Sequence, residues 1–462
     1  MSETFSRLIR RVVDVKEKEI ATLVWSAVYF FFILSAYYVL RPIRDEVGVA
    51  VMEGKKGRAE ELSWLFTATL VGILLIHPLF ASLVSRLPRK RFVPLSLRFF
   101  ILNLAIFFLL YEFVDPAKSL WIGAVFFVWV SIFNLFVVSV FWSFMTDIFR
   151  PEQSKRLFGM VAVGGSLGAT AGSFITSKLA EPLGPVNLLL VSALLLELGC
   201  YASKSLERHK SKLALTTDQT DQQTEPHPAK SNSEDLIGGG LFDGIKSVFA
   251  SPYLLGISGL MLFFTISSTF IYFQQADIVS QVFANDKVGR TKLFANRDLV
   301  VNVLTLVTQL FLTGRIVRWF GIGVALAFLP ALGVVGFTLL GAWPGLVAVM
   351  TLDILRRSAN FAIQRPAREA LYAVLDRSDK YKAKNFNDTF VYRVGDQIGA
   401  WSYPAMVLLG LGASGQAYSM IPLSIAWLFL ALWINRRYLR FNRAPSSPPG
   451  PAEGQAMRVD PY

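Results

Sequence analysis

The stretch SKSLERHKSKLALTTDQTDQQTEPHPAKSNSEDLIGGG, residues 203–240, divides this chain into two comparable parts. It is polar, whereas 53% of the whole sequence is hydrophobic and only 17% is charged. A segment of this composition buries too little apolar surface to fold by itself, so we interpret it as a flexible linker. Six long apolar runs precede it and six follow it, which predicts two similar halves.

The apolar runs have the length of transmembrane helices, because about 20 apolar residues are needed to cross the bilayer core. Soluble domains also carry more charge, about a quarter of their residues. We therefore predict an all-α polytopic membrane protein with about 12 spans in two six-helix halves. The predicted spans are 21–41, 62–84, 93–113, 120–145, 157–179, 186–203, 252–275, 294–314, 320–341, 345–365, 390–410 and 417–436.

Basic residues in the connections predict the orientation of these spans. They concentrate on the side of the linker, which the positive-inside rule assigns to the cytoplasm, although the loops near 47–61 and 276–293 are exceptions. The predicted parts are a cytoplasmic N-terminus (1–20), an N-terminal half (21–203), a cytoplasmic linker (204–245), a C-terminal half (246–437) and a disordered cytoplasmic tail (438–462).

Several classes of function are disfavoured by composition. The formal net charge of +13 fits the same loop bias, so we do not expect nucleic acid as a partner. One cysteine, Cys200, and three scattered histidines offer no metal-ligand spacing, so we expect neither a metal nor a cofactor. There is no G-x4-G-K-[S/T] loop and no nucleophile–base pair in a soluble segment, so we predict that the chain is not an enzyme. A monomer is consistent with the sequence.

Charged residues at the end of the first span form one candidate site. A charge in hydrocarbon costs at least ~2.5–3.5 kcal/mol, so it is expected to face a watery cavity or a partner. Arg41, Arg44, Asp45 and Glu46 crowd this end, where Pro42 should stop or kink the helix. The arginines could attract an anion while Asp45 or Glu46 pairs with one of them. The alternative is a charge cluster that reaches water at the membrane surface.

The tenth span carries a deeper group, Asp353, Arg356, Arg357 and Asn360. Spacings of three and four residues put Asp353 on the same helix face as both arginines, so we expect an internal salt bridge. One arginine should then remain for a substrate.

Further charged pairs begin other spans: Arg297 and Asp298 the eighth, and Arg393 and Asp396 the eleventh. Arginine suits phosphate and carboxylate because its planar fork donates two parallel hydrogen bonds and stays charged. The predicted substrate contacts are Arg41, Arg44, Arg356, Arg357, Arg393 and Asn360, and the predicted ion-pair partners are Asp45, Glu46, Asp353 and Asp396. The expected partners are therefore the lipid bilayer and a small anionic solute.

Small residues recur in both halves. Gly164 and Gly168 in the fifth span match Gly395 and Gly399 in the eleventh at one offset, about 231 residues. Small residues at four-residue spacing let helices approach closely in lipid. These helices could act as gates during alternating access, or they could simply be tightly packed. The repeated six-helix half resembles the major facilitator plan, in which the substrate site lies between the halves.

Three segments resemble the ATP/ADP translocase family of plastids and intracellular bacteria, especially its shorter bacterial relatives. They are YYVLRPIRDE (37–46), FWSF with PEQSKRLFG (141–144 and 151–159) and DKYKAKNFND (379–388). The resemblance covers most of the membrane part. It implies a twelve-span facilitator that exchanges nucleotides without a metal cofactor, in a bacterial inner membrane.

The resemblance also implies roles for individual residues. Arg44 stands where a basic residue near the end of the first span matters for transport. Lys380, Lys382 and Lys384 match the lysines before the eleventh span. From the residues alone, the positive-inside bias and surface ion pairs explain these lysines as well.

The chain departs from the family pattern where acidic residues are expected. It has Val130 or Ser131 in the fourth span, Tyr272 in the seventh, and Ala276 where a lysine follows. The combined prediction is a secondary transporter of an organic anion, a nucleotide or a related phosphorylated metabolite, that works by alternating access. The alternatives are a proton-coupled exporter of other small molecules, with Asp353 as its acid, and a non-transporting receptor or scaffold.

Overall fold

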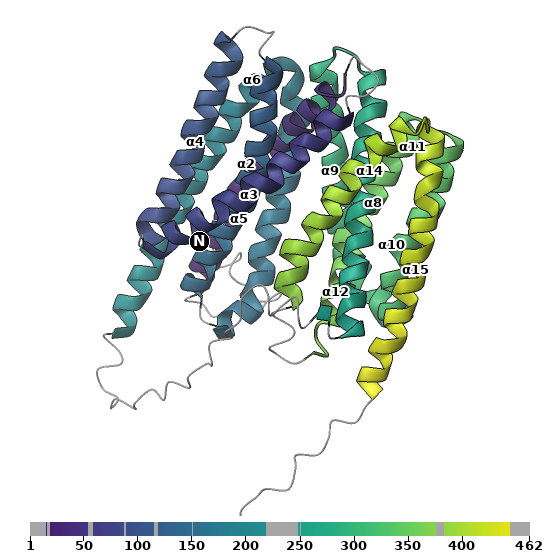
Figure 1. The fold of residues 1–462 in the computed structure, drawn as a ribbon. Helices are drawn as coiled ribbons and strands as arrows, with labels where there is room; N and C mark the ends of the chain where they lie inside the picture. Colours follow the sequence, from purple (N-terminus) through teal and green to yellow (C-terminus); the bar gives the residue numbers. More distant parts are fainter. Residues whose placement is uncertain are drawn as a thin grey trace, which may run out of the picture.

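Long helices form two bundles that stand side by side (Figure 1). The structure is a computed structural model that describes residues 15, 19–53, 59–86, 89–114, 119–149, 151–218, 248–249, 251–375 and 383–443. All regular secondary structure within these ranges is helical. The predicted all-α architecture is therefore confirmed.

The N-terminal half has one helix that contains two spans. Its helices are α2 (Ile20–Ala50), α3 (Ala59–Arg86), α4 (Arg89–Phe113), α5 (Ser119–Ile148) and α6 (Pro151–Asp218). Helix α6 breaks at Gly184, which has φ 77° and lies between Pro182 and Pro185. Glycine adopts positive φ without a steric penalty, and proline disrupts helical hydrogen bonding, so the chain bends here.

The C-terminal half contains two π-helical turns. Its elements are α8 (Pro252–Val282), α9 (Lys287–Phe311), α10 (Thr313–Ala342), α11 (Leu346–Ala359), the π-helix η4 (Asn360–Gln364), α12 (Arg365–Leu371), the π-helix η5 (Asn387–Val391), α14 (Tyr392–Leu408) and α15 (Ala413–Arg443). Helices α11, η4 and α12 follow one another without a break. π-Helical turns are rare and occur frequently at functional sites.

Eight helices in the described ranges are long and apolar enough to cross a membrane. Helix α6 is one of these eight although it contains two predicted spans. Helices α9, α11 and α14 fall outside the eight, and each carries charged residues, namely Arg297, Asp353 and Arg393 respectively. Helices α11 and α14, with 14 and 17 residues, are also too short to belong to this group.

The helices define two ends of the molecule. Helix α6 ends and α8 begins at the end that we call the linker end, which is at the bottom of Figure 1. The short connections 51–53, 283–286 and 343–345 lie at the opposite end, the turn end. Helix α6 continues through residues 204–218 of the predicted linker, and α15 continues through residues 438–443 of the predicted tail. Residues 219–245 and 444–462 lie outside the described residues.

The two halves share a hydrophobic core at the turn end. The larger buried cluster joins N-terminal residues to turn-end residues of the other half, such as Phe273 and Met420. A separate cluster contains linker-end residues of the C-terminal half, such as Ile257 and Trp427. Apolar packing between the halves is thus concentrated at the turn end, so the structure shows a conformation that is closed there.

Candidate functional site

A cavity of about 280 Å³ lies between the halves. Helices α2, α3 and α5 line one side, and α8 and α14 line the other. Three predicted substrate contacts, Arg41, Arg44 and Arg393, are among the lining residues, together with one acidic residue, Asp396. The cavity wall is therefore predominantly cationic.

Arg44 lies within a helix rather than at its end. Pro42 does not stop α2, which continues to Ala50. The Arg44 guanidinium donates to Asp45 Oδ1 at 3.0 Å and to Ser131 Oγ at 3.4 Å. It also lies 4.8 Å from the centre of the Phe127 ring, within the range of a cation–π contact. The expected pairing of an arginine with Asp45 is present.

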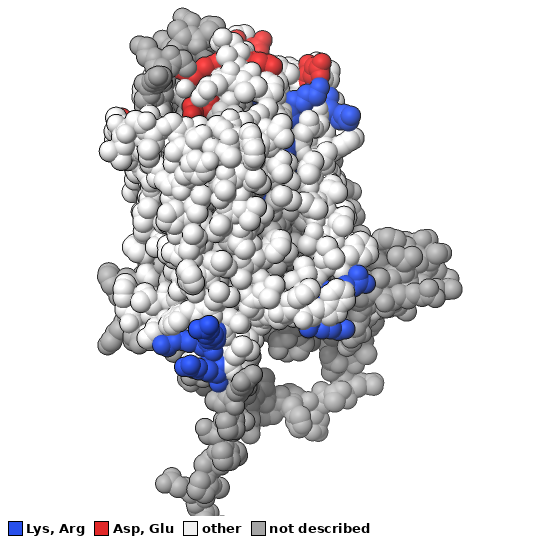
Figure 2. Space-filling view, turned by 90° about the vertical axis from the view of Figure 1, so that its right-hand side faces the viewer, with Lys and Arg blue, Asp and Glu red and all other residues white. Residues whose placement is uncertain are grey.

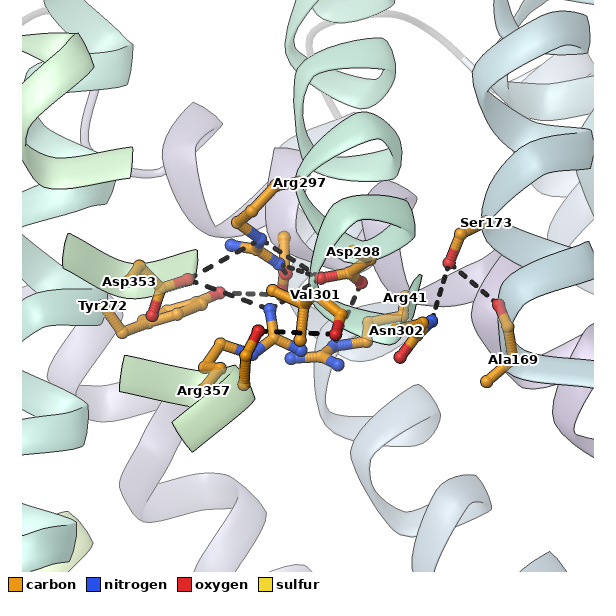
Figure 3. Close-up of polar contacts among 12 residues, drawn as sticks. Arg41, Ala169, Ser173, Tyr272, Arg297, Asp298, Val301, Asn302, Asp353 and Arg357 are labelled. Carbon is orange, nitrogen blue, oxygen red and sulfur yellow. Dashed lines mark hydrogen bonds and ion pairs between the residues drawn. The ribbon is translucent and has the colours of Figure 1, made fainter. Parts of the chain in front are cut away.

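Arg297 joins the two halves at the centre of the charged network (Figure 3). Its Nη2 donates to Asp45 Oδ2 at 2.6 Å, across the interface between the halves, and to Asp298 Oδ1 at 2.9 Å. Its Nη1 donates to Gln275 Oε1 at 2.7 Å. The side chain is only 2% exposed, so these contacts replace its hydration.

The tenth-span charges pair partly as their spacing predicts. Arg356 donates to Asp353 at 2.8 Å, three residues apart. Arg357 lies 3.8 Å from Asp353, four residues away, and donates a hydrogen bond to Asp298 of α9 at 2.6 Å. Arg41 lies 3.5 Å from the other oxygen of Asp298. Both tenth-span arginines therefore have an acidic partner in this conformation.

The connected network has more positive than negative charge. It contains five arginines and three aspartates, a formal excess of two positive charges: Arg41, Arg44, Arg297, Arg356 and Arg357 against Asp45, Asp298 and Asp353. In addition, Arg44 Nε, Arg356 Nε and Arg357 Nη2 are buried without a hydrogen-bond acceptor among the described residues. Buried unpaired donors are costly, so the network is complementary to an anion with several oxygens.

A second ion pair lies across the cavity on α14. Arg393 Nη1 is 3.5 Å from Asp396 Oδ2, which follows the predicted three-residue spacing. Thr269 of α8 donates to the other Asp396 oxygen at 2.9 Å. Asp396 has partners on two helices and Arg393 is 29% exposed, so Arg393 can reorient toward a ligand.

Two predicted site residues lie elsewhere. Glu46 faces Arg290 of α9 at 3.4 Å, and Arg290 also binds Glu53 at 3.0 Å, so Glu46 belongs to the closed turn end. Asn360 is buried at the start of η4 and does not line the cavity. Neither residue contacts the arginines that line the cavity wall in this conformation.

The basic segment before α14 is described only in part. Lys384 donates to Glu369 of α12 at 2.7 Å, whereas Lys380 and Lys382 lie outside the described residues. This contact is a surface ion pair, one of the two explanations that we gave for these lysines from the sequence. No group of three or more His, Cys, Asp and Glu side chains in the described ranges could hold a metal ion.

The glycine stripes pack helices together within each half. A methyl group at Gly164 or Gly168 would overlap the backbone of α2 at Ala27 or Phe31. Gly395 and Gly399 face α8 in the equivalent arrangement. The predicted close approach of helices is present, and it joins the first span to the fifth and the seventh to the eleventh.

Arg297 and Asp298 are the main site residues that the sequence alone did not select. They lie inside α9 rather than at the start of a span, because the helix begins at Lys287. In the sequence, an arginine directly followed by an aspartate, ahead of an apolar run, marks this position. The sequence does not show that Asp45 is the partner, because the contact joins residues 252 positions apart.

Comparison with known proteins places this architecture in a family. Residues 20–361 match the model of the Major Facilitator Superfamily. ADP,ATP carrier protein 1 of Chlamydia trachomatis is 23% identical over 358 residues, which are 70% of this chain and 67% of the carrier. The chloroplastic ADP,ATP carrier protein 1 of Arabidopsis thaliana is 24% identical over 469 residues, covering 87% and 71%. The predicted resemblance to these carriers is therefore confirmed at low identity.

Solved transporter structures share the fold. A bacterial homolog of the human lysosomal transporter Spinster, inward-facing and unoccupied, has a TM-score of 0.53 at 14% identity, covering 94% of this chain and 100% of the other. An auto-inhibited POT family peptide transporter has a TM-score of 0.58 at 14% identity, covering 91% and 96%. The chain is accordingly a membrane transporter rather than an enzyme, and it belongs to the Major Facilitator Superfamily.

Proposed function

We propose that this transporter moves an organic anion, specifically a nucleotide or a related phosphorylated metabolite, through the central cavity by alternating access. The supporting observation is the cationic wall, where Arg41, Arg44 and Arg393 oppose a single acid, Asp396. The ion-pair network that includes Arg41 and Arg44 has a surplus of two positive charges, which favours a multiply charged anion. Relatives named as ADP,ATP carriers support a nucleotide as that anion.

Aromatic side chains provide a second recognition surface in the same cavity. Phe127, Tyr272 and Tyr392 line it beside the arginines. Nucleobases stack on aromatic faces with about 1–3 kcal/mol per base. A phosphate group at the arginines and a base on these rings would use both surfaces together.

Transport would follow from competition for the arginines. Phosphate oxygens that bind Arg44 would compete with Asp45, and those that bind Arg41 would compete with Asp298. Asp45 is also the acceptor through which Arg297 joins the halves. Substrate binding would thereby rearrange the ion pairs around the contact that joins the halves and allow them to rock.

Exchange in proteoliposomes tests this proposal. Vesicles preloaded with ADP should take up labelled ATP, whereas empty vesicles and vesicles loaded with citrate give the comparison. Arg44→Ala and Arg393→Ala should each lower the uptake rate at least about tenfold, because a bidentate charge-assisted contact is lost. Arg98→Ala is the matched control, since Arg98 pairs with Glu197 on the exposed surface at 3.2 Å.

Melting temperatures of the same variants separate loss of function from loss of folding. Unchanged uptake in both folded cavity variants would show that the cavity is not the substrate site. If the vesicles took up another anion but no nucleotide or sugar phosphate, the cavity would remain the proposed binding site and the proposed substrate class would be rejected.

We further propose that the linker end faces the cytoplasm of a bacterial inner membrane. Arg315, Arg318, Arg436 and Arg440 lie on helix segments at that end, in agreement with the positive-inside rule. A reporter that is active only in the cytoplasm should be active when it is fused after residue 462, and a reporter that is active only in the periplasm should be inactive there. Activity of a periplasmic reporter at that position would reverse the orientation.

A further inference from the structure

Helices α10 and α15 present a face with an apolar groove and a basic border. Figure 2 shows this side of the molecule as a broad uncharged band, with basic side chains gathered near the linker end. In a membrane-spanning protein, such a band faces lipid acyl chains, and the border lies at the level of the head groups.

The groove begins where the backbone of α10 breaks. Gly321 has φ 76° and ψ 173°, so residues 313–320 depart from the axis of the spanning part. Thr313 anchors this segment by donating to the Ala362 carbonyl at 2.7 Å. Trp319 and Phe320 are 67% and 61% exposed. Exposed aromatic residues beside arginines are typical of the membrane interface.

Beyond the break, the groove runs along the surface of the two helices. The groove has a volume of about 700 Å³. Its lining includes Gly323, Ala327, Phe328 and Ala331 of α10 and Leu439 of α15. This volume falls within the range of about 300–1,000 Å³ that is typical of small-molecule sites. The lining is largely apolar, which suits an acyl chain.

The arginines around the groove have no acidic neighbours on these helices. Neither α10 nor α15 contains an Asp or a Glu. Arg315 and Arg318 precede the groove on α10. Arg436 and Arg440 directly follow the lining residues Asn435 and Leu439 on α15, and all four arginines are exposed. None of them forms an ion pair in the part of the chain that the structure describes, in contrast to Arg98 with Glu197. The charge of this border is available to an external anion.

We propose that this groove is a binding site for an anionic phospholipid. One acyl chain lies along Gly323, Ala327 and Ala331, and the phosphate contacts Arg436 and Arg440 of α15. A lipid fits better than a soluble anion because the largely apolar groove lies on helices α10 and α15, on the side of the molecule that shows the uncharged band (Figure 2). This site is separate from the central cavity and does not depend on the transported substrate.

Lipid-dependent melting of the purified protein in neutral detergent tests the site. Phosphatidylglycerol should raise the melting temperature, because a ligand that binds the folded state stabilises it. Phosphatidylcholine with the same chains should not. The double variant Arg436→Gln/Arg440→Gln should weaken the apparent affinity for phosphatidylglycerol roughly 25-fold, at about fivefold per arginine. Ala327→Trp, which fills the groove and keeps the charges, should abolish the effect.

Arg98→Gln is the matched control and should retain the full effect of phosphatidylglycerol. Native mass spectrometry of the same samples should show a bound phosphatidylglycerol that is lost in the double variant and in Ala327→Trp. Equal stabilisation by both lipids, or full binding in either groove variant, would refute the proposal. Stabilisation by inorganic phosphate alone to the same extent would identify a soluble-anion site and overturn the lipid assignment.

Discussion

Arg297 illustrates how one residue connects the two halves. It donates to Asp45 from the other half and to Asp298 and Gln275 from its own. Arg297→Ala should leave buried carboxylates without this partner, and breaking a buried pair in this way costs about 3–5 kcal/mol. We expect a clear fall in the melting temperature of the purified protein.

The control for Arg297 is again the exposed pair of Arg98. Surface ion pairs contribute about 0–1 kcal/mol to the free energy of unfolding. The Arg98→Ala variant should therefore have almost the same melting temperature as the unmodified protein. Equal melting of the Arg297→Ala and Arg98→Ala variants would mean that the central network does not stabilise this conformation.

Arg44 offers a test of geometry as distinct from charge. Lysine keeps the positive charge but lacks the planar fork that binds phosphate through two parallel hydrogen bonds. Under the proposed function, Arg44→Lys should weaken nucleotide binding about tenfold, and Arg44→Ala should weaken it further. Titration of the thermal shift with ADP measures both affinities. Equal affinity of the arginine and lysine proteins would exclude bidentate recognition at this position.

At the level of elements, the contact between α2 and α6 depends on glycine. A methyl group at Gly168 would overlap the Phe31 backbone, whereas nothing lies within 4 Å of the Cβ position at Gly159 of the same helix. We expect Gly168→Ala to lower the melting temperature by several degrees. Gly159→Ala should leave it unchanged or raise it, because alanine favours a helix by about 1 kcal/mol over glycine.

The two glycine variants have the same substitution on the same helix, so the gain in helix propensity cancels when their melting temperatures are compared. If Gly168→Ala were as stable as Gly159→Ala, the close approach of α2 and α6 would not be required for folding. Four-residue spacing predicted that these glycines pack against a helix. It did not identify the partner, because a stripe of small residues fits any adjacent helix.

At the scale of the whole molecule, alternating access requires the halves to separate at the turn end. Ser177 of α6 donates to Asn296 of α9 across the interface, on the turn-end side of Arg297. In a Cys200→Ser background, Ser177→Cys with Asn296→Cys should be cross-linked by a short thiol-specific reagent. Exchange should then stop and recover after reduction.

Each single cysteine variant, treated in the same way, controls for modification without a cross-link. Full exchange by the cross-linked protein would show that the halves do not part at this level, and rocking would be ruled out as the transport motion.

The helical class, the two halves and most charged positions of the site follow from the amino-acid sequence alone. Apolar length and the polar segment at 203–240 are local properties, and so is the three-residue spacing that pairs Asp353 with Arg356. The tertiary structure decided the rest. In the folded protein, Arg357 pairs with Asp298 and Arg297 pairs with Asp45. Glu46 faces Arg290, away from the cavity. These pairs form because buried charges take the nearest opposite charge in space, and only packing of the helices brings those residues together.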